Sequence, residues 1–194
     1  MFSTKIYSKW RTIFKPSLPV YQEKEYYYNE IPSSIQLNLT SFKLRGYYQS
    51  YKYFHQYKDI LFNIMNIYNL QSQNYDLYYQ PYFNTTKHVV AIHFRIGDYI
   101  TLPHLYHILP LQYYINAIRL IVTDLKTPNS NIRLLCVYDH TDHNRIETDY
   151  LVPLRIKFPG IELIVVDSAM PDWQQMLLMS LCRVIIIANS TFSW

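Results

Sequence analysis

The sequence predicts an α/β fold built on a Rossmann-like parallel sheet, preceded by a helical and irregular N-terminal part. Two observations predict this class. Four near-continuous apolar runs recur between residues 88 and 188, and the segments between them have helical periodicity. Apolar runs without polar alternation are typical of strands covered on both faces, and strands that alternate with helices form parallel sheets.

Residues 1–84 are expected to form a partial N-terminal region. Residues 1–34 are polar and aromatic and contain three prolines, so they predict irregular structure with short elements at most. Apolar and aromatic residues recur at three- and four-residue spacing over 53–68, which predicts an amphipathic helix from about residue 49. Residues 70–86 contain a proline break and are interpreted as a connector.

Residues 85–194 are expected to form the domain that contains the sheet. Its predicted elements follow one another as strand 88–93, helix 110–125, strand 133–138, helix 142–157, strand 161–166, a helix from Asp172 and strand 184–188. Crossover connections between parallel strands share one handedness, so the loops that follow the strands should lie along one edge of the sheet. A ligand is expected at that edge.

Polar side chains follow each predicted strand. Those with chemistry suited to an anionic ligand are His93, Arg95, Gly97 and Asp98 after the first strand, Asp139 after the second, and Asn189, Ser190, Thr191 and Ser193 after the last. A guanidinium offers a planar fork to phosphate oxygens, glycine lets the backbone approach closely, and hydroxyls and amides add neutral donors. These groups together fit a diphosphate.

Each of these residues also has a structural interpretation. Arg95 and Asp98 could form a surface ion pair, Gly97 could be a turn residue, and the Asn-Ser-Thr stretch at 189 could cap a helix. The ligand interpretation is favoured because all of these groups converge on one predicted edge.

Composition limits the partners. The chain has 194 residues, a net charge of +4 and a pI near 8.9, and its lysines and arginines are scattered. This argues against a nucleic-acid surface. The N-terminal stretch is broken by basic residues, unlike a signal peptide, and no apolar run is long enough to span a membrane. A soluble chain with a cytoplasmic location is expected, and the oligomeric state is left open.

Four segments carry a resemblance to the α-1,2-fucosyltransferases, glycosyltransferase family 11. They are LRGYYQSYKYF (44–54), VVAIHFRIGDY (89–99), LPLQYYINAI (109–118) and LLMSLCRVIIIANSTFSW (177–194). The family shows, in the same order, a GYFQSxKYF-like stretch, HxRRGDY, LPxxYYxxAI and LMSxCxxxIxANSxFSWWGAWL. The last segment is the most specific of the four.

The resemblance implies an incomplete glycosyltransferase B-like architecture, with an acceptor-side region at 1–84 and a GDP-sugar-binding domain at 85–194. It implies inverting transfer of fucose from GDP-fucose to the 2-hydroxyl of a galactose residue in a glycan, without a metal or other cofactor. Members of the family are often membrane-associated.

The resemblance also implies residue roles. Arg95 would bind the diphosphate beside Gly97, and Asp139 would contact the guanine or ribose. The residues implied to line the donor site near the phosphates are Asn189, Ser190, Thr191 and Ser193. Asp98 and His93 are the candidates for the catalytic base.

Three departures from the family pattern suggest a second interpretation. Ile96 stands where the family has a second arginine, which would weaken donor binding by about 1.5–3 kcal/mol if that contact is direct. The glycine-rich opening segment is absent, and the chain stops at Trp194 inside the last motif. Truncation at both ends is therefore expected, and the alternative function is an inactive relic that at most binds a nucleotide.

A third interpretation is a metal-dependent hydrolase. Asp139, His140, Asp142 and His143 could supply oxygen and nitrogen ligands. Four ligands in one five-residue loop rarely all face one ion, so a solvated loop and helix cap is the favoured interpretation of this segment.

Overall fold

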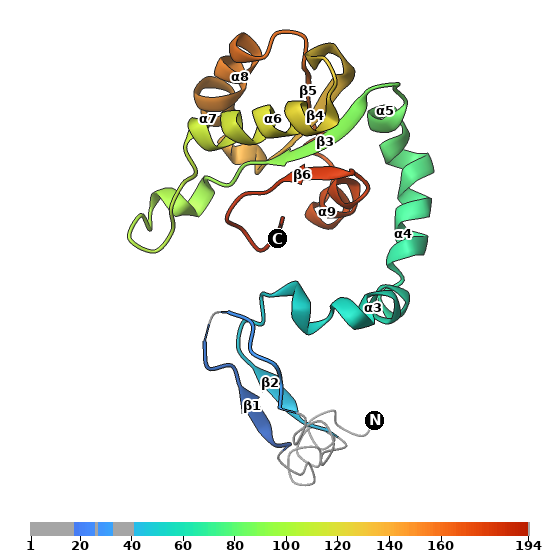
Figure 1. Ribbon diagram of the computed structural model, residues 1–194, viewed down its shortest axis with the longest axis vertical. Helices are drawn as coiled ribbons and strands as arrows, with labels where there is room; N and C mark the ends of the chain where they lie inside the picture. Colours follow the sequence, from blue (N-terminus) through green and yellow to red (C-terminus); the bar gives the residue numbers. More distant parts are fainter. Residues whose placement is uncertain (1–17, 26, 33–40, 194) are drawn as a thin grey trace, which may run out of the picture. The chain divides into compact units, whose positions relative to one another are not determined.

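The computed structural model describes residues 18–25, 27–32 and 41–193. The chain divides into two compact units, residues 1–62 and 63–194 (Figure 1). Residues 63–84, expected in the N-terminal region, therefore belong to the same unit as the sheet. Expectations for residues 1–17 and for Trp194 lie outside the described residues.

The first unit contains two short strands, β1 (Val20–Gln22) and β2 (Lys43–Arg45), which pair in parallel. The turn after β2 is tied back to β1's end, because the backbone N–H of Tyr47 donates to Oε2 of Glu23 at 2.6 Å. Two 3₁₀ turns then cover Tyr51–Tyr53 and His55–Tyr57. Among the described residues up to position 34, where irregular structure was expected, the short strand β1 is the regular element.

The helix predicted from residue 49 begins later and is interrupted. Helix α3 covers Lys58–Ile64 and helix α4 covers Ile67–Asn74. Between them Asn66 has φ +57°, a left-handed conformation that ends the first helix. In the described parts of the chain, no helix has the length and apolar character needed to cross a membrane.

The connector expected at 70–86 is wrong, because the chain stays helical there. Helix α4 continues into a π-helical turn at Tyr75–Tyr79 and then into helix α5 (Gln80–Phe83). The Tyr79 side chain is fully buried and its hydroxyl donates to the backbone oxygen of Gln174 at 2.7 Å. Pro81 lies just after this π-helical turn, as the second residue of α5.

The second unit confirms the predicted α/β class and its parallel sheet. The strands are β3 (His88–His93), β4 (Ile132–Val137), β5 (Glu162–Val165) and β6 (Val184–Ile186). Their order in the sheet is β5-β4-β3-β6, and every neighbouring pair is parallel. The chain runs outward from β3 to β5 and then returns to place β6 on the other side of β3. The carboxyl ends of β3 and β6 are therefore neighbours.

Helices cover both faces of this sheet (Figure 1). The helices are α6 (Leu111–Leu125), α7 (His143–Ile146), α8 (Val152–Lys157) and α9 (Asp172–Ser180), with a π-helical turn at Glu147–Leu151 between α7 and α8. Val90 and Ile92 of β3 pack in the core with α6, α7 and α8, whereas Ala91 packs in the core with α9. Apolar residues on both faces explain why the strands read as continuous apolar runs.

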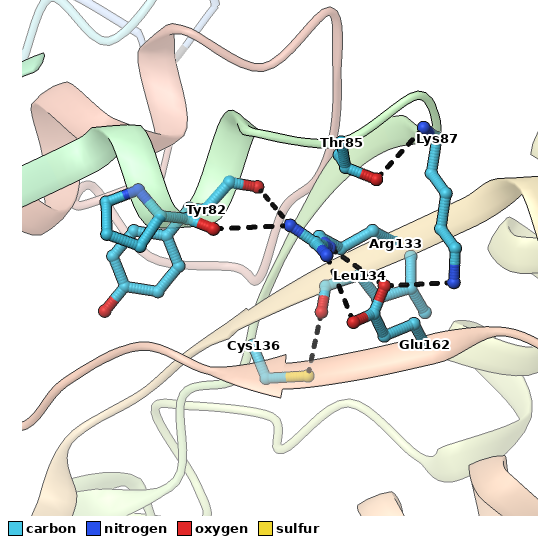
Figure 2. Close-up of polar contacts among 8 residues, drawn as sticks. Tyr82, Thr85, Lys87, Arg133, Leu134, Cys136 and Glu162 are labelled. Atoms are coloured by element: carbon cyan, nitrogen blue, oxygen red, sulfur yellow. Dashed lines mark hydrogen bonds and ion pairs between the residues drawn. The ribbon is translucent and has the colours of Figure 1, made fainter.

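An ion-pair cluster closes the amino end of the sheet. Figure 2 shows the Arg133 guanidinium between the carboxylate of Glu162 and the carbonyl of Tyr82. Arg133 donates from Nε and Nη2 to the two oxygens of Glu162, and from Nη1 to the Tyr82 carbonyl at 2.9 Å. Lys87 pairs with the same Glu162 carboxylate at 3.0 Å. This cluster joins β4, β5 and the end of α5 on the edge opposite the loops predicted to bind a ligand.

Candidate functional site

The loop after β3 is folded into a tight turn and tied to the loop after β4. A 3₁₀ turn covers Gly97–Ile100, and Gly97 has φ +33°, in the left-handed region that favours glycine. The Gly97 N–H donates to Oδ2 of Asp142 at 2.7 Å. Gly97 is thus the turn residue that sets the direction of the chain after Arg95.

Arg95 lines a pocket, and two contacts hold its guanidinium. Its Nη2 donates to Oδ1 of Asp98 at 2.6 Å, and its Cζ lies 5.4 Å from the centre of the Tyr99 ring. Its Nε is buried and has no hydrogen-bond partner among the described residues. The ion pair expected by the structural interpretation is therefore present, and one strong donor of Arg95 is still unsatisfied.

His93 closes β3 and faces the last loop. Its side chain is 4% exposed, and its Nδ1 lies 2.9 Å from Oγ of Ser193, while its ring packs on Phe192 with centres 4.9 Å apart. Burial lowers the pKa of His93 to about 4, and the nearby charge of Arg95 acts in the same direction. The imidazole is therefore neutral near pH 7.

Side chains of the loop after β6 make hydrogen bonds within the loop and to His107. Oγ of Ser193 accepts the N–H of Ala188 at 3.2 Å, and Oγ of Ser190 accepts the N–H of Phe192 at 3.3 Å. Nδ2 of Asn189 donates to the carbonyl of His107 at 2.6 Å. Thr191 is exposed. These bonds give the loop a fixed shape beside the end of β3.

A pocket joins these elements at the carboxyl edge of the sheet. Its lining residues are His93, Arg95, Val137, Tyr138, Asp139, Asp172, Gln175 and Phe192. The structure thus brings together Arg95, His93 and Asp139 of the predicted residues. The remaining predicted residues lie in the loops around the pocket and are not among its lining residues: Gly97, Asp98, Asn189, Ser190, Thr191 and Ser193.

The loop after β4 is organised by hydrogen bonds to neighbouring groups. Oδ1 of Asp139 accepts from both the N–H and the hydroxyl of Thr141, which lowers the pKa of Asp139. Asp142 holds the Gly97 amide, and Nδ1 of His143 lies 2.9 Å from the Tyr138 hydroxyl. Across the described ranges, no three His, Cys, Asp or Glu side chains are placed to share a metal ion. The Asp139 carboxylate caps the 3₁₀ turn His140–Asp142, in agreement with the loop-and-cap interpretation.

Ile96, the departure from the family pattern at the expected second arginine, is 1% exposed and packs in the core, so its side chain does not line the pocket. Two residues that do line it were not predicted as ligand contacts. Asp172 and Gln175 enter the pocket from the first turns of α9. The sequence offered a signal for both residues. A helix that starts at Asp172, after the third strand, must begin at the carboxyl edge of the sheet, where the ligand is expected.

Comparison with known families gives one match that covers nearly the whole chain. The family model described as Glycosyl transferase family 11 matches residues 4–194. No curated protein and no solved structure matches the chain significantly.

Proposed function

Because the chain belongs to glycosyl transferase family 11, we propose that it transfers fucose from GDP-fucose to the 2-hydroxyl of a galactose residue in a glycan, with inversion. Membership of the family makes the chain a glycosyltransferase, which implies a nucleotide-sugar donor and a glycan acceptor. The choice of fucose, GDP and galactose is the proposed part.

The observation that carries this proposal is the position of Arg95. It lies where the central strand β3 ends, in one pocket with Phe192 of the loop after β6. Ligands of open α/β sheets bind in the crevice outside the carboxyl ends of the strands, where the strand order reverses. The return of the chain from β5 to β6, beside β3, creates that reversal here.

The charge of Arg95 suits the chemistry of the transfer. As the acceptor oxygen attacks C1 of fucose, the bond to the β-phosphate oxygen breaks and negative charge accumulates on GDP. A guanidinium that is already positioned stabilises this charge without reorganisation. We propose that Arg95 does so with the guanidinium donors that Asp98 does not occupy.

Proton removal from the acceptor hydroxyl needs a base within hydrogen-bond reach. Asp98 and His93 are both proposed candidates. His93 is buried, hydrogen-bonded to Ser193, and has a pKa of about 4, so it is a weak base. The Asp98 carboxylate is largely exposed and can meet an acceptor that arrives from solvent. We therefore favour Asp98 as the base and His93 as a neutral hydrogen-bonding group.

The first experiment is a calorimetric titration of the full chain with GDP. We expect GDP to bind and Arg95→Ala to weaken binding about 10- to 100-fold, as for loss of a charge-assisted hydrogen bond. Arg145→Ala is the matched control, because Arg145 is an exposed arginine paired with Asp149 on α7 and the adjoining turn. Unchanged GDP affinity in Arg95→Ala would overturn the proposed role of this residue.

Turnover is measured on the same protein with GDP-fucose and a galactoside acceptor, as release of GDP coupled to formation of the fucosylated product. Rapid release of GDP in the presence of the acceptor, with slow release in its absence, supports the proposed fucosyl transfer. Binding of GDP without turnover supports the alternative, a nucleotide-binding relative that does not catalyse. Activity that persists in a chelator supports the metal-independent chemistry proposed for Arg95.

A further inference from the structure

Tyr99 lies between the two loops that form the candidate donor site. It belongs to the 3₁₀ turn Gly97–Ile100, its side chain is 8% exposed, and its N–H donates to the Ile96 carbonyl at 2.8 Å. The turn itself is anchored through Gly97 to Asp142. These bonds fix the backbone around Tyr99, so its side chain holds a defined position against the residues it contacts.

The Tyr99 ring supports the guanidinium of Arg95. The distance from Cζ of Arg95 to the ring centre is 5.4 Å, within the range of a cation–π contact. The ring is itself stacked on Tyr106, with centres 4.4 Å apart and planes 14° apart. Since Arg95 Nε has no partner among the described residues, the ring and Asp98 are the contacts that hold the head of Arg95.

The Tyr99 hydroxyl reaches the other loop. It donates to the backbone carbonyl of Asn189 at 2.9 Å. The Asn189 side chain in turn donates to the carbonyl of His107, so the segment after β3 holds the loop after β6 at two points. The Tyr99 side chain thus contacts Arg95 with its ring and Asn189, in the loop after β6, with its hydroxyl.

We propose that Tyr99 is a positioning residue that holds Arg95 and the 189–193 loop in one arrangement for the donor diphosphate. This inference rests on the proposed function, because it concerns how the diphosphate site keeps its shape. Tyr99 acts through Arg95 and Asn189 and does not itself contact the reacting atoms.

The structure offers a matched control in Tyr113. Its hydroxyl donates to the carbonyl of Ile187 at 2.8 Å, so it makes the same kind of bond to the same terminal segment from helix α6. Its ring packs on Tyr114, with centres 5.1 Å apart. If Tyr99 only stabilises the fold, Tyr99→Phe and Tyr113→Phe should behave alike.

The test measures GDP affinity by calorimetry for the full chain and for Tyr99→Phe, Tyr99→Leu and Tyr113→Phe. We expect Tyr99→Phe to weaken binding about 3- to 10-fold, as for loss of one hydrogen bond. Tyr99→Leu also removes the ring beside Arg95, so the loss should rise by about a further 2- to 5-fold. Tyr113→Phe should stay within about 2-fold of the wild type.

Amide hydrogen exchange on the same variants gives a readout that needs no ligand. Tyr99→Phe should speed exchange of residues 95–101 and 189–193 together, whereas Tyr113→Phe should leave residues 95–101 unchanged. Equal effects of the two Phe variants on affinity and exchange overturn the inference. If the wild type does not bind GDP, the proposed function fails instead, and the exchange patterns still decide whether Tyr99 couples the loops. Tyr99→Phe carries the test if Tyr99→Leu does not fold.

Discussion

The imidazole of His93 is neutral near pH 7 because it is buried beside a guanidinium, which lowers its pKa to about 4. In the unfolded chain the pKa of histidine is about 6.5. Between these values the unfolded chain binds more protons than the folded one, so the free energy of unfolding must fall as the pH falls. The full contribution is present above pH 6.5 and is lost progressively toward pH 4.

We therefore predict that the free energy of unfolding decreases by about 2 kcal/mol between pH 7 and pH 5 because of His93. Urea titrations across this range measure it. Asp139 and Glu162 have lowered pKa values and lose their contribution at lower pH, below the usual carboxylate range. His93→Asn keeps a polar atom near Ser193 and should reduce the loss of unfolding free energy between pH 7 and pH 5. His104→Asn, at an exposed histidine, is the control variant.

The two base candidates are separated by their effects on turnover. We predict that Asp98→Asn lowers kcat by about 100-fold or more, since general-base catalysis contributes roughly this much. His93→Asn should lower kcat less. The donor KM should rise for Asp98→Asn as well, because Asp98 also holds Arg95. A smaller loss of kcat in Asp98→Asn than in His93→Asn would exclude Asp98 as the base.

The sequence predicts which residues share the site better than it predicts the contacts that each of them makes. Arg95, His93 and Asp139 were placed in one site because each follows an apolar strand, and the order of a parallel sheet then brings them together. Ile96 stands where the family pattern has a second arginine, yet it packs in the core. The fold of this loop depends on bonds such as that from the Gly97 N–H to Asp142, between residues far apart in sequence.

At the scale of elements, the four strands and the helices between them were predicted to within a few residues. Their apolar runs reflect burial on both faces, which leaves a clear pattern in the sequence. The segment at 70–86 was not recognised as helical because its sequence is mostly polar and aromatic. Its helical turns are stabilised by Tyr79, whose partner Gln174 is almost one hundred residues later.

The ion-pair cluster at the amino edge of the sheet leads to a prediction about stability. Arg133 is mostly buried and donates hydrogen bonds to the Glu162 carboxylate and to the Tyr82 carbonyl at the end of α5 (Figure 2). We predict that Arg133→Met lowers the free energy of unfolding by about 1–3 kcal/mol, because the Tyr82 carbonyl loses its donor and the Glu162 carboxylate, among the described residues, keeps only Lys87. GDP affinity should not change, since the cluster lies on the edge opposite the pocket.

Arg145→Met is the control for this change. Arg145 pairs with Asp149 on an exposed helical surface, at 3.4 Å, and such pairs contribute about 0.5 kcal/mol or less. Urea unfolding of both variants, with GDP titration of each, measures the contrast. Equal losses of stability would show that the buried cluster adds no more than a surface ion pair.

At the scale of the whole molecule, burial is divided unevenly between the two units. The described residues up to Phe62 include no buried side chain, whereas the second unit contains both core clusters of the sheet. Regions with few buried apolar contacts open locally at low free energy, and cores open only with global unfolding. Access of a protease to the backbone should therefore differ strongly between the units.

We predict that brief trypsin treatment cleaves first at the exposed Lys43, Arg45 or Lys52 and leaves a product that contains residues 63–194 and still binds GDP. A ligand stabilises only the unit that binds it, so GDP at 100 times its Kd should slow later cleavage of the second unit by about 100-fold. Cleavage of the first unit should keep its rate. Mass spectrometry of the products over time measures both effects. Equal protection of the two units by GDP would mean that the nucleotide also binds the N-terminal unit, and first cleavage inside residues 63–193 would contradict the assignment of stability to the sheet.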